Sequence, residues 1–529
     1  MGSPTTVNRD ATSAPVGPAI NPWLIAVAVM LGTFMEVLDT TVVNVSLPHI
    51  AGDLGATPDE ATWALTSYLV ANAIILPLTG WLANYFGRKR LLMAAVIGFT
   101  SASVLCGIAP NLALLIVFRV VQGATGGALQ PLSQAVMLEA FPPQDRGKAM
   151  SFWGLGIVVA PMLGPVLGGW LTDSYSWRWV FYINLPVGLA SILMTKAFIF
   201  DPAYIRRTTA RIDKWGIGLL AIAIGSLQIV LDKGQEEDWF SSPMIVSLSA
   251  AAAVGLILFI IHEFHTDNPV VNLRVFKERT YSGGVFLMTT LGFVLYGSLV
   301  LLPLLLQTLL GYPALQAGIA MFPRGLGSFI GMPITGMLLS RVDPRKLLAV
   351  GICGASFTLL QLSWLSLDAG YWDIFWPQFI QGLSLSLVFV PLTTVTMNPI
   401  AKENMGNATS LFNFMRNVGG SVGIAIATTL VSRYTQQHIN ILGAHVTATN
   451  PQAVRTLDTF RAMFMSRGAD LATATRQAYA AVFGIVAKQA TRLAFVDTFR
   501  LLAGIFILMI PLLFILKRPK HGAEPVAAH

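Results

Sequence analysis

The sequence predicts an all-α polytopic membrane protein with fourteen transmembrane helices. Of its 529 residues, 54% are hydrophobic and only 11% are charged, whereas soluble domains have about 25% charged residues. The apolar residues gather in runs of roughly 20 residues, the length that a helix needs to cross a bilayer core. The net charge of +8 does not indicate nucleic-acid binding, because the basic residues lie in short loops between these runs. Cys106 and Cys353 lie far apart inside apolar runs, so no disulfide framework or cysteine metal site is expected.

The expected spans form two groups of six with a further pair between them. The first group lies at residues 23–45, 61–82, 91–109, 112–138, 150–171 and 179–199. The pair lies at 213–231 and 242–263, and the second group lies at 282–306, 315–339, 347–366, 373–397, 406–430 and 498–516. We therefore expect an N-terminal six-helix bundle over 23–199, two inserted helices with linkers over 200–281, and a C-terminal six-helix bundle over 282–516.

The basic loops predict the orientation in the membrane, because Lys and Arg concentrate in short cytoplasmic loops. The loops after even-numbered spans contain Arg88, Lys89, Arg90, Arg146, Lys148, Arg206, Arg207, Arg211, Lys214, Arg274, Lys277, Arg279, Arg341, Arg345 and Lys346. The short loops after odd-numbered spans offer only Arg178 and Lys233. Both termini are therefore predicted to be cytoplasmic. The polar residues 1–22 lack the features of a secretory signal, so we expect two cytoplasmic tails, a disordered one over 1–22 and a second over 517–529.

The segment 431–497 is the one basic loop assigned to the outer side. It is longer than 60 residues, and loops of that length are translocated regardless of charge. It is rich in Ala, Thr, Gln and Arg and contains apolar patches at 460–465 and 479–486. We expect amphipathic helices on the outer face, which act either as a lid or spacer or as a docking surface for a partner protein.

An internal repeat relates the two groups of six spans. Short motifs recur 256 to 259 residues apart: Gly80-x-Leu82 with Gly336-x-Leu338, Arg119-x-x-Gln122-Gly123 with Gln378-x-x-Gln381-Gly382, and Gly147-x-Ala149-x-Ser151 with Gly406-x-Ala408-x-Ser410. Parallel repeats of this kind build transporters that work by alternating access, with a site between the halves near the middle of the membrane. The repeat therefore predicts a transporter.

Two acids lie midway along the first span. Glu36 and Asp39 are three residues apart and so share one helical face. Each carboxylate costs about 2.5–3.5 kcal/mol at this depth unless it is neutral, paired or in contact with water. Because a medium of low dielectric favours the neutral acid, we expect either residue to carry a proton, Asp39 above all. The alternative is that the acids are merely hydrogen-bonded within the bundle.

Three arginines lie within other spans. Arg119 precedes Gln122 and Gly123 in the fourth span and is the expected cation of the proton-coupling set, the alternative being a structural ion pair. Arg324 stands between Pro323 and Gly325, where a broken helix would expose backbone to substrate or ions. For Arg324 and Arg416, structural pairing and a transport role remain open.

The fifth span contains closely spaced glycines and prolines that predict a flexing seam at a gate. In a membrane bundle small residues allow close helix contacts and proline permits bends, although tight packing without motion is the alternative. The expected gating positions of this span are Gly156, Pro161, Gly164, Pro165, Gly168 and Gly169.

Aromatic and polar side chains are interleaved on several spans and suit bulky amphipathic ligands. The expected substrate-binding residues are Gln122, Gln130, Trp153, Tyr182, Tyr296, Gln378, Gln381, Phe412, Asn413 and Arg416. His262 and His265 are too few to bind zinc without partners. The sequence contains no Gly-x-x-x-x-Gly-Lys-Ser/Thr phosphate loop, so direct ATP drive is not expected. We therefore expect neither metal nor cofactor, and no enzymatic activity.

Taken together, these motifs resemble the major facilitator superfamily, and within it the fourteen-span drug:proton antiporters of the EmrB/QacA kind. The stretch from Leu38 to Pro48 is similar to the first-span signature of that family, with Asp39 at its acidic position. Arg119-x-x-Gln122-Gly123 resembles the fourth-span motif, whose arginine takes part in proton transfer. Gly156 to Gly169 matches the antiporter motif, and Trp177 to Gly188 is similar to the stretch at the sixth span. Asp232-Lys233-Gly234 and the long outer loop look most like the EmrB branch.

The resemblance implies a proton-coupled multidrug efflux transporter of a bacterial inner membrane, which confers antibiotic resistance. It also implies a periplasmic membrane-fusion adaptor and an outer-membrane channel as partners. The alternative within transporters is a dedicated exporter of one class, such as a fatty acid, a bile-type acid or a metabolite. A membrane structural or sensory protein that transports nothing is a third possibility. The sequence departs from the family pattern at Asn84, where the loop motif that contains Arg88 usually has an acid, so the charge-relay gating expected of Arg88 is not implied in full.

Overall fold

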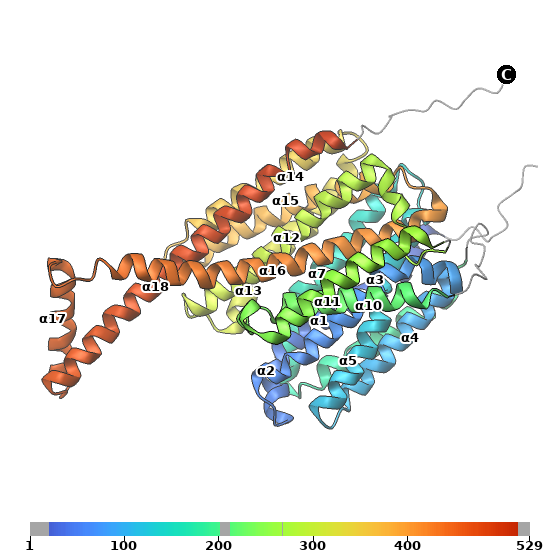
Figure 1. Ribbon diagram of the computed structural model, residues 1–529. Helices are drawn as coiled ribbons and strands as arrows, with labels where there is room; N and C mark the ends of the chain where they lie inside the picture. Colours follow the sequence, from blue (N-terminus) through green and yellow to red (C-terminus); the bar gives the residue numbers. More distant parts are fainter. Residues whose placement is uncertain (1–20, 202–211, 267, 517–529) are drawn as a thin grey trace, which may run out of the picture.

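The structure, a computed structural model, describes residues 21–201, 212–266 and 268–516. Both predicted tails, apart from Asn21 and Pro22, and the loop arginines Arg206, Arg207 and Arg211 lie outside the described residues. Every regular element of the described chain is a helix, and the helices form a bundle of long rods with one extended projection (Figure 1).

The N-terminal group of spans begins with α1, whose first turn is capped by the side chain of Asn21 and contains Pro22 at its start. The helices are α1 (Pro22–Asp53), α2 (Pro58–Ala61), α3 (Trp63–Phe86), α4 (Arg88–Gly107), α5 (Leu112–Gly126), α6 (Leu129–Ala140), α7 (Arg146–Ser174), α8 (Trp179–Tyr182) and α9 (Asn184–Phe198). The fourth and sixth predicted spans are thus each divided into two helices. The fourth divides at Gly127, which lies against the backbone of Asn72 in α3, where a side chain would collide with that backbone.

The inserted pair and the C-terminal group follow. The inserted helices are α10 (Lys214–Lys233) and α11 (Pro243–His265), with short 3-10 turns η1 (Trp239–Ser241) and η2 (Leu273–Lys277) after them. The C-terminal helices are α12 (Arg279–Thr308), α13 (Ala314–Leu338), α14 (Pro344–Ser363), α15 (Tyr371–Met397), η3 (Lys402–Asn404), α16 (Met405–Gly443), α17 (Pro451–Ser466), α18 (Leu471–Leu508) and η4 (Pro511–Ile515).

Thirteen helices of the described chain are long and apolar enough to cross a membrane, and they coincide with thirteen of the fourteen predicted spans. The remaining predicted span is α13. Its 25 residues suffice in length, but Arg324, five glycines and two prolines make it less apolar. The protein is therefore an all-α, multi-pass membrane protein.

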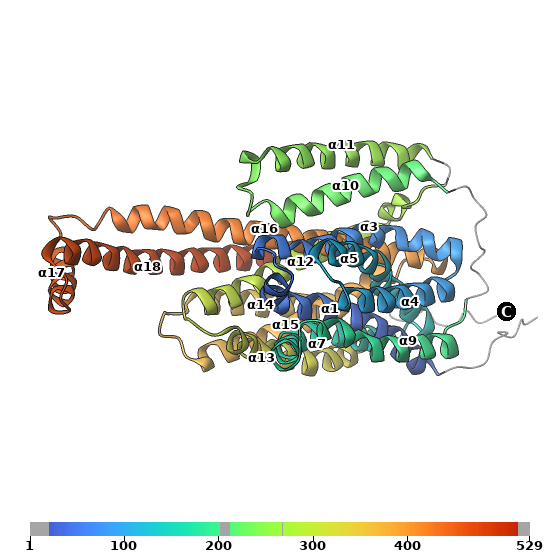
Figure 2. The same cartoon turned by 90° about the horizontal axis from the view of Figure 1, so that it is seen from below.

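The two groups of spans meet along two helix pairs. Gly325 of α13 lies against the side chain of Met162 in α7, and Gly80 of α3 lies against the backbone of Asn407 in α16. The α10–α11 pair lies on one side of the molecule (Figure 2). α10 contacts both groups: Gly225 packs near Ile74 of α3, and Gln228 hydrogen-bonds Ser421 of α16 at 3.2 Å.

The segment 431–497 differs from the prediction of separate helices on the outer face. Most of it extends the neighbouring spans: α16 continues to Gly443 and α18 begins at Leu471, so the thirteenth and fourteenth spans are longer than predicted. The two extensions project beyond the other helices and diverge toward their ends, and α17 lies between these ends at the tip (Figures 1 and 2). No glycine or proline interrupts residues 424–442, so the helix has no local reason to end at the membrane surface.

Candidate functional site

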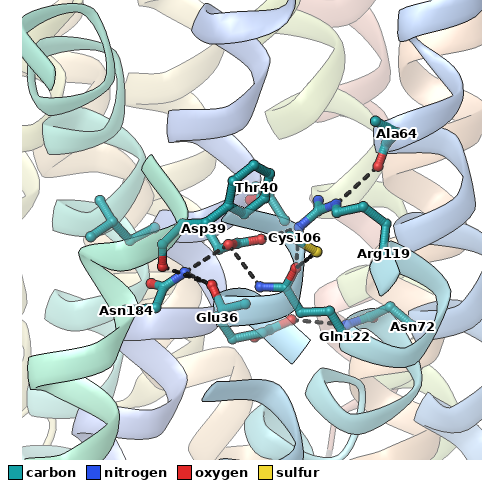
Figure 3. Close-up of polar contacts among 12 residues, drawn as sticks. Glu36, Asp39, Thr40, Ala64, Asn72, Cys106, Arg119, Gln122 and Asn184 are labelled. Atoms are coloured by element: carbon teal, nitrogen blue, oxygen red, sulfur yellow. Dashed lines mark hydrogen bonds and ion pairs between the residues drawn. The ribbon is translucent and has the colours of Figure 1, made fainter. Parts of the chain in front are cut away.

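The site is centred on the two acids of α1. Asp39 is fully buried and Glu36 is 4% exposed. Their side chains lie on one face of the helix, where α3, α5, α6 and α9 supply polar partners (Figure 3). The three-residue spacing predicted from the sequence brings the two carboxylates into the same region but gives them different partners.

Asp39 accepts three hydrogen bonds from side chains of the N-terminal group. Arg119 Nη1 lies 2.5 Å from Asp39 Oδ2 in an ion pair whose two members are both fully buried. Gln122 Nε2 and Asn184 Nδ2 donate to Asp39 Oδ1 at 2.9 and 2.8 Å. A buried carboxylate is tolerated only when it is paired and hydrogen-bonded, and Asp39 meets both conditions.

Arg119 is held in place on every side. Its Nε donates to the carbonyl oxygen of Ala64 at 2.9 Å, and its Nη1 also donates to Gln122 Oε1 at 2.8 Å. The guanidinium lies over the ring of Tyr68, 4.1 Å from the ring centre, a favourable cation–π contact. Its Nη2 has no hydrogen-bond partner among the described residues.

Glu36 belongs to a second chain of hydrogen bonds, which crosses between the two groups of spans. Its carboxylate accepts from Asn72 Nδ2 at 3.0 Å and from Gln130 Nε2 at 2.6 Å. Gln130 Oε1 in turn accepts from Arg416 Nη2 of α16 at 2.5 Å. Gln130 therefore links an acid of the N-terminal group to a cation of the C-terminal group.

A parallel contact lies one turn further along α6. Asn413 Nδ2 donates to Gln134 Oε1 at 2.5 Å, and both residues are fully buried. Both cross-seam contacts join polar groups that water does not reach. Separating the two groups of spans here leaves these groups unpaired unless water or a ligand replaces the partners.

The structure does not gather the predicted substrate-binding residues at one place. Gln130, Asn413 and Arg416 form the cross-seam contacts described above, and Gln122 belongs to the Asp39 cluster. Trp153 of α7 stacks on Phe389 of α15 with ring centres 6.0 Å apart. Phe412, which precedes Asn413 in α16, is fully buried. Gln378 donates to Gln381 at 3.3 Å within α15.

Two predicted substrate-binding residues contact other parts of the bundle. Tyr182 packs its ring against Gly107 at the end of α4. Tyr296 packs its ring against Gly420 of α16, within the C-terminal group. Neither tyrosine has a hydrogen bond to the Asp39 or Glu36 clusters among the contacts of the described chain.

The predicted gating residues of α7 lie along α1, the helix that carries both acids. Gly156 lies against Met30, Gly164 against Thr41 and Gly168 against Val42, all at distances where a side chain would collide. Gly169 faces open space, and Pro165 lies next to Gly318 of α13. Pro161 lies within the same helix and does not break it.

Arg88, also predicted as a gating residue, forms a buried ion pair with Glu139 of α6. Both residues line a cavity of about 190 Å³ beside Lys402. The acid that Arg88 contacts therefore comes from α6, although Asn84 replaces the acid expected in the loop motif.

Several polar partners were not predicted from the sequence. Asn184, Asn72, Gln134, Cys106 and Glu139 all belong to these clusters, Cys106 through its thiol 3.5 Å from Gln122 Oε1. Asn184 stands within the sixth-span stretch that carries the family resemblance, so a polar residue in an apolar run was the available signal. The others had no distinguishing sequence pattern.

Two bundles of apolar helices with buried ionisable residues, of which Glu36 and Arg416 are linked across the seam through Gln130, are typical of secondary transporters. The sequence profile described as Major Facilitator Superfamily matches residues 29–424, and the chain belongs to that family. It is a membrane transporter and not an enzyme.

Similar proteins place the chain within the EmrB branch of the superfamily. Multidrug export protein EmrB of Haemophilus influenzae is 43% identical over 433 residues, which cover 81% of this chain and 84% of that protein. Fatty acid resistance protein FarB of Neisseria gonorrhoeae is 38% identical over 515 residues, which cover 96% of this chain and 98% of that protein. A crystal structure of a double tryptophan mutant of XylE aligns with a TM-score of 0.61 at 14% identity, covering 95% of this chain and 97% of that one. At that identity the structural likeness concerns the fold alone.

Proposed function

We propose that this chain is a proton-coupled multidrug efflux transporter that exports hydrophobic and amphipathic toxic compounds by alternating access. The buried ion pair of Asp39 with Arg119 is the observation that carries the proposal. A close relative named as a multidrug export protein supports the substrate range. The proton gradient is the driving force, and no resident cofactor is required.

Proton binding acts through the hydrogen bonds of Asp39. A proton on its carboxylate removes the charge that pairs with Arg119 and weakens the acceptance of hydrogen bonds from Gln122 and Asn184. The buried arginine then lacks its counter-ion, which disfavours this packing of α1 against α5 and α9. In alternating access the protein opens to one side of the membrane or to the other. Proton and drug each shift the equilibrium between these two states by binding one state more tightly than the other.

A modest pH gradient across the membrane is sufficient to drive the export of substrate. One pH unit across the membrane corresponds to about 1.4 kcal/mol per proton. One-for-one electroneutral exchange then supports about tenfold accumulation of substrate. Glu36 is the second protonatable group, and its link to Arg416 through Gln130 supports a role in the movement of one bundle relative to the other.

A dedicated exporter of one substrate class is the second candidate. The relative named for fatty acid resistance, which the chain covers almost completely, favours it. A narrow substrate profile distinguishes this candidate from a multidrug exporter.

The projection formed by α16, α17 and α18 has the features of a binding surface for a partner protein outside the membrane. Basic residues predominate on it, and several apolar side chains are exposed: Ile441, Met465, Leu471, Tyr479, Phe483 and Ile485. We propose that a periplasmic adaptor binds here and connects the exporter to an outer-membrane channel. The chain then lies in the inner membrane with both termini on the cytoplasmic side.

The test is transport by the purified chain in proteoliposomes with an imposed pH gradient. Ethidium serves as the fluorescent substrate and a pH-sensitive dye follows protons. We expect wild type to show ethidium-dependent proton flux and Asp39→Asn to abolish it. Asp368→Asn is the matched control, because Asp368 is an exposed loop acid that undergoes the same chemical change.

The outcomes separate the candidates. Flux that survives Asp39→Asn and is lost in Glu36→Gln transfers the coupling role to Glu36. Wild-type protein that binds ethidium without moving protons contradicts coupled export of this compound. Flux with dodecanoate but not with ethidium supports the dedicated exporter.

A further inference from the structure

Arg324 is a buried cation without a counter-ion. It lies in α13 with 6% of its surface exposed. Its Nη2 is buried and has no hydrogen-bond partner, and within the described chain no acid lies within ion-pair distance of the guanidinium. Desolvation of an unpaired charge costs several kcal/mol, so an arginine retained in this state indicates a ligand that is absent from the bare chain.

The surroundings of Arg324 supply no neutralising residue. The C-terminal spans α12, α13, α14 and α16 contain no Asp or Glu at all. The only acid of α15 is Asp373, which is exposed in its first turn. The charge of Arg324 is therefore not balanced from any of the five helices.

The internal repeat shows what is missing. In the N-terminal group, Gly123 of α5 lies against the backbone oxygen of Tyr68 in α3. In the C-terminal group, Gly382 of α15 lies in the same way against the backbone oxygen of Arg324 in α13. Arg324 thus occupies the position that Tyr68 has in the other half, where Tyr68 contacts Arg119.

The two halves differ in how they balance the arginine. Arg119 is neutralised by Asp39 of α1, whereas α12, the counterpart of α1, is free of acids. Arg119 itself corresponds to Gln378, a buried residue whose Oε1 also lacks a partner. The C-terminal half has a buried cation at the position of Tyr68 and has no acid on α12, the counterpart of α1.

We propose that Arg324 forms an anion subsite that recognises the carboxylate of an amphipathic substrate. The carboxylate takes the part that Asp39 plays in the other half. Gly325, the next residue, lies against Met162 of α7, so α13 borders the seam of the two bundles at this level, and we place the apolar part of the substrate along that seam. This inference rests on the proposed export function and names a substrate class for it.

The experiment measures binding to the full chain in nanodiscs of neutral phosphatidylcholine, by tryptophan fluorescence. The probes are dodecanoate and uncharged dodecanamide, which differ in charge but not in chain length. A charge-assisted hydrogen bond in a buried site predicts that wild type binds dodecanoate at least about tenfold more tightly. Arg324→Met abolishes that preference, and Arg324→Lys keeps part of it.

Controls separate recognition from structure. Arg341→Gln removes an exposed arginine just beyond α13 and leaves the preference unchanged. Without ligand, Arg324→Met is at least as thermally stable as wild type, because it removes an unpaired buried charge. A destabilised or unfolded Arg324→Met means that the arginine has a structural partner and overturns the proposal, as does equal binding of the two probes by wild type. Because binding requires no pH gradient, failure of proton-coupled export leaves this result interpretable.

Discussion

Asp39 and Arg119 form an ion pair that is dry on all sides, and Gln122, Asn184 and Ala64 satisfy most of the remaining hydrogen bonds. Such a pair is weak evidence for net stability, but removal of one partner leaves the other charge buried and unpaired. Neutralising the Asp39 carboxylate, by mutation or by the proposed proton, therefore leaves Arg119 without its counter-ion.

Asp39→Asn is expected to lower the stability of the purified protein by about 3–5 kcal/mol, because Arg119 loses its counter-ion. Arg119→Gln has a similar effect, and the double variant is less destabilised than the sum of the two. Thermal unfolding of the four proteins in detergent measures this coupling. Additive effects would show that the two charges do not interact.

At the scale of the element, α7 and α1 approach so closely that glycine is required on α7. Gly164 lies against Thr41, two residues beyond Asp39, and a methyl group there would overlap the Thr41 side chain. The acid-bearing segment of α1 is thus held by backbone contact with α7. A displacement of α7 moves that segment directly.

Gly164→Ala is expected to reduce proton-coupled transport and to cost about 1–3 kcal/mol of stability through overpacking. Gly169→Ala is the matched control, since it lies five residues along the same helix and faces open space. It should be neutral, or stabilising by up to about 1 kcal/mol from helix propensity. Equal loss of transport in both variants would point to helix flexibility, rather than contact with α1, as the function of these glycines.

The projecting helices allow a second test at this scale. Replacement of residues 444–470 by a short flexible linker removes the tip and α17 while the transmembrane parts of α16 and α18 remain. We expect unchanged ethidium flux in proteoliposomes and loss of drug resistance in cells. Intact resistance in cells would show that the tip is not the adaptor-binding surface.

For the whole molecule, the two bundles are closed against each other on the side of the basic loops. Gly80 lies against Asn407, and Gly147 lies against Leu339 and the backbone of Gly336. These contacts lie at the ends of spans whose loops are predicted to be cytoplasmic. Release of substrate to one side and uptake from the other requires that they open in each cycle.

A disulfide across this seam should arrest the cycle. A Cβ atom at Gly147 would lie 3.5 Å from that of Leu339, within the range that a disulfide allows. In a background without Cys106 and Cys353, Gly147→Cys with Leu339→Cys is expected to cross-link under oxidation and to lose at least about 90% of its transport, a loss of about tenfold. Reduction should restore activity, whereas full activity of the cross-linked protein would mean that this seam does not open.

The amino-acid sequence by itself determined the fold class, the positions of thirteen spans, the internal repeat and the family. These follow from local quantities, namely run length, hydropathy and motif spacing, because a bilayer forces each apolar run into a helix that satisfies its own backbone. It also located Glu36, Asp39 and Arg119, because a charge in an apolar run stands out at once. It did not reveal that α16 and α18 extend beyond the other helices, since the same helix-forming residues suit a loop helix and a continued span.

Only the tertiary structure decided which polar groups meet. Asp39 pairs with Arg119, which lies 80 positions further along the chain. Glu36 lies three positions before Asp39, and it is linked to Arg416 through Gln130 instead. It also showed Arg324 to be unpaired, although in the sequence Arg324 and Arg416 looked alike. The physical reason is that ion pairs depend on distances between helices, and helix packing is set by the summed contacts of whole helix faces. The pattern of residues along the chain does not contain those distances between helices.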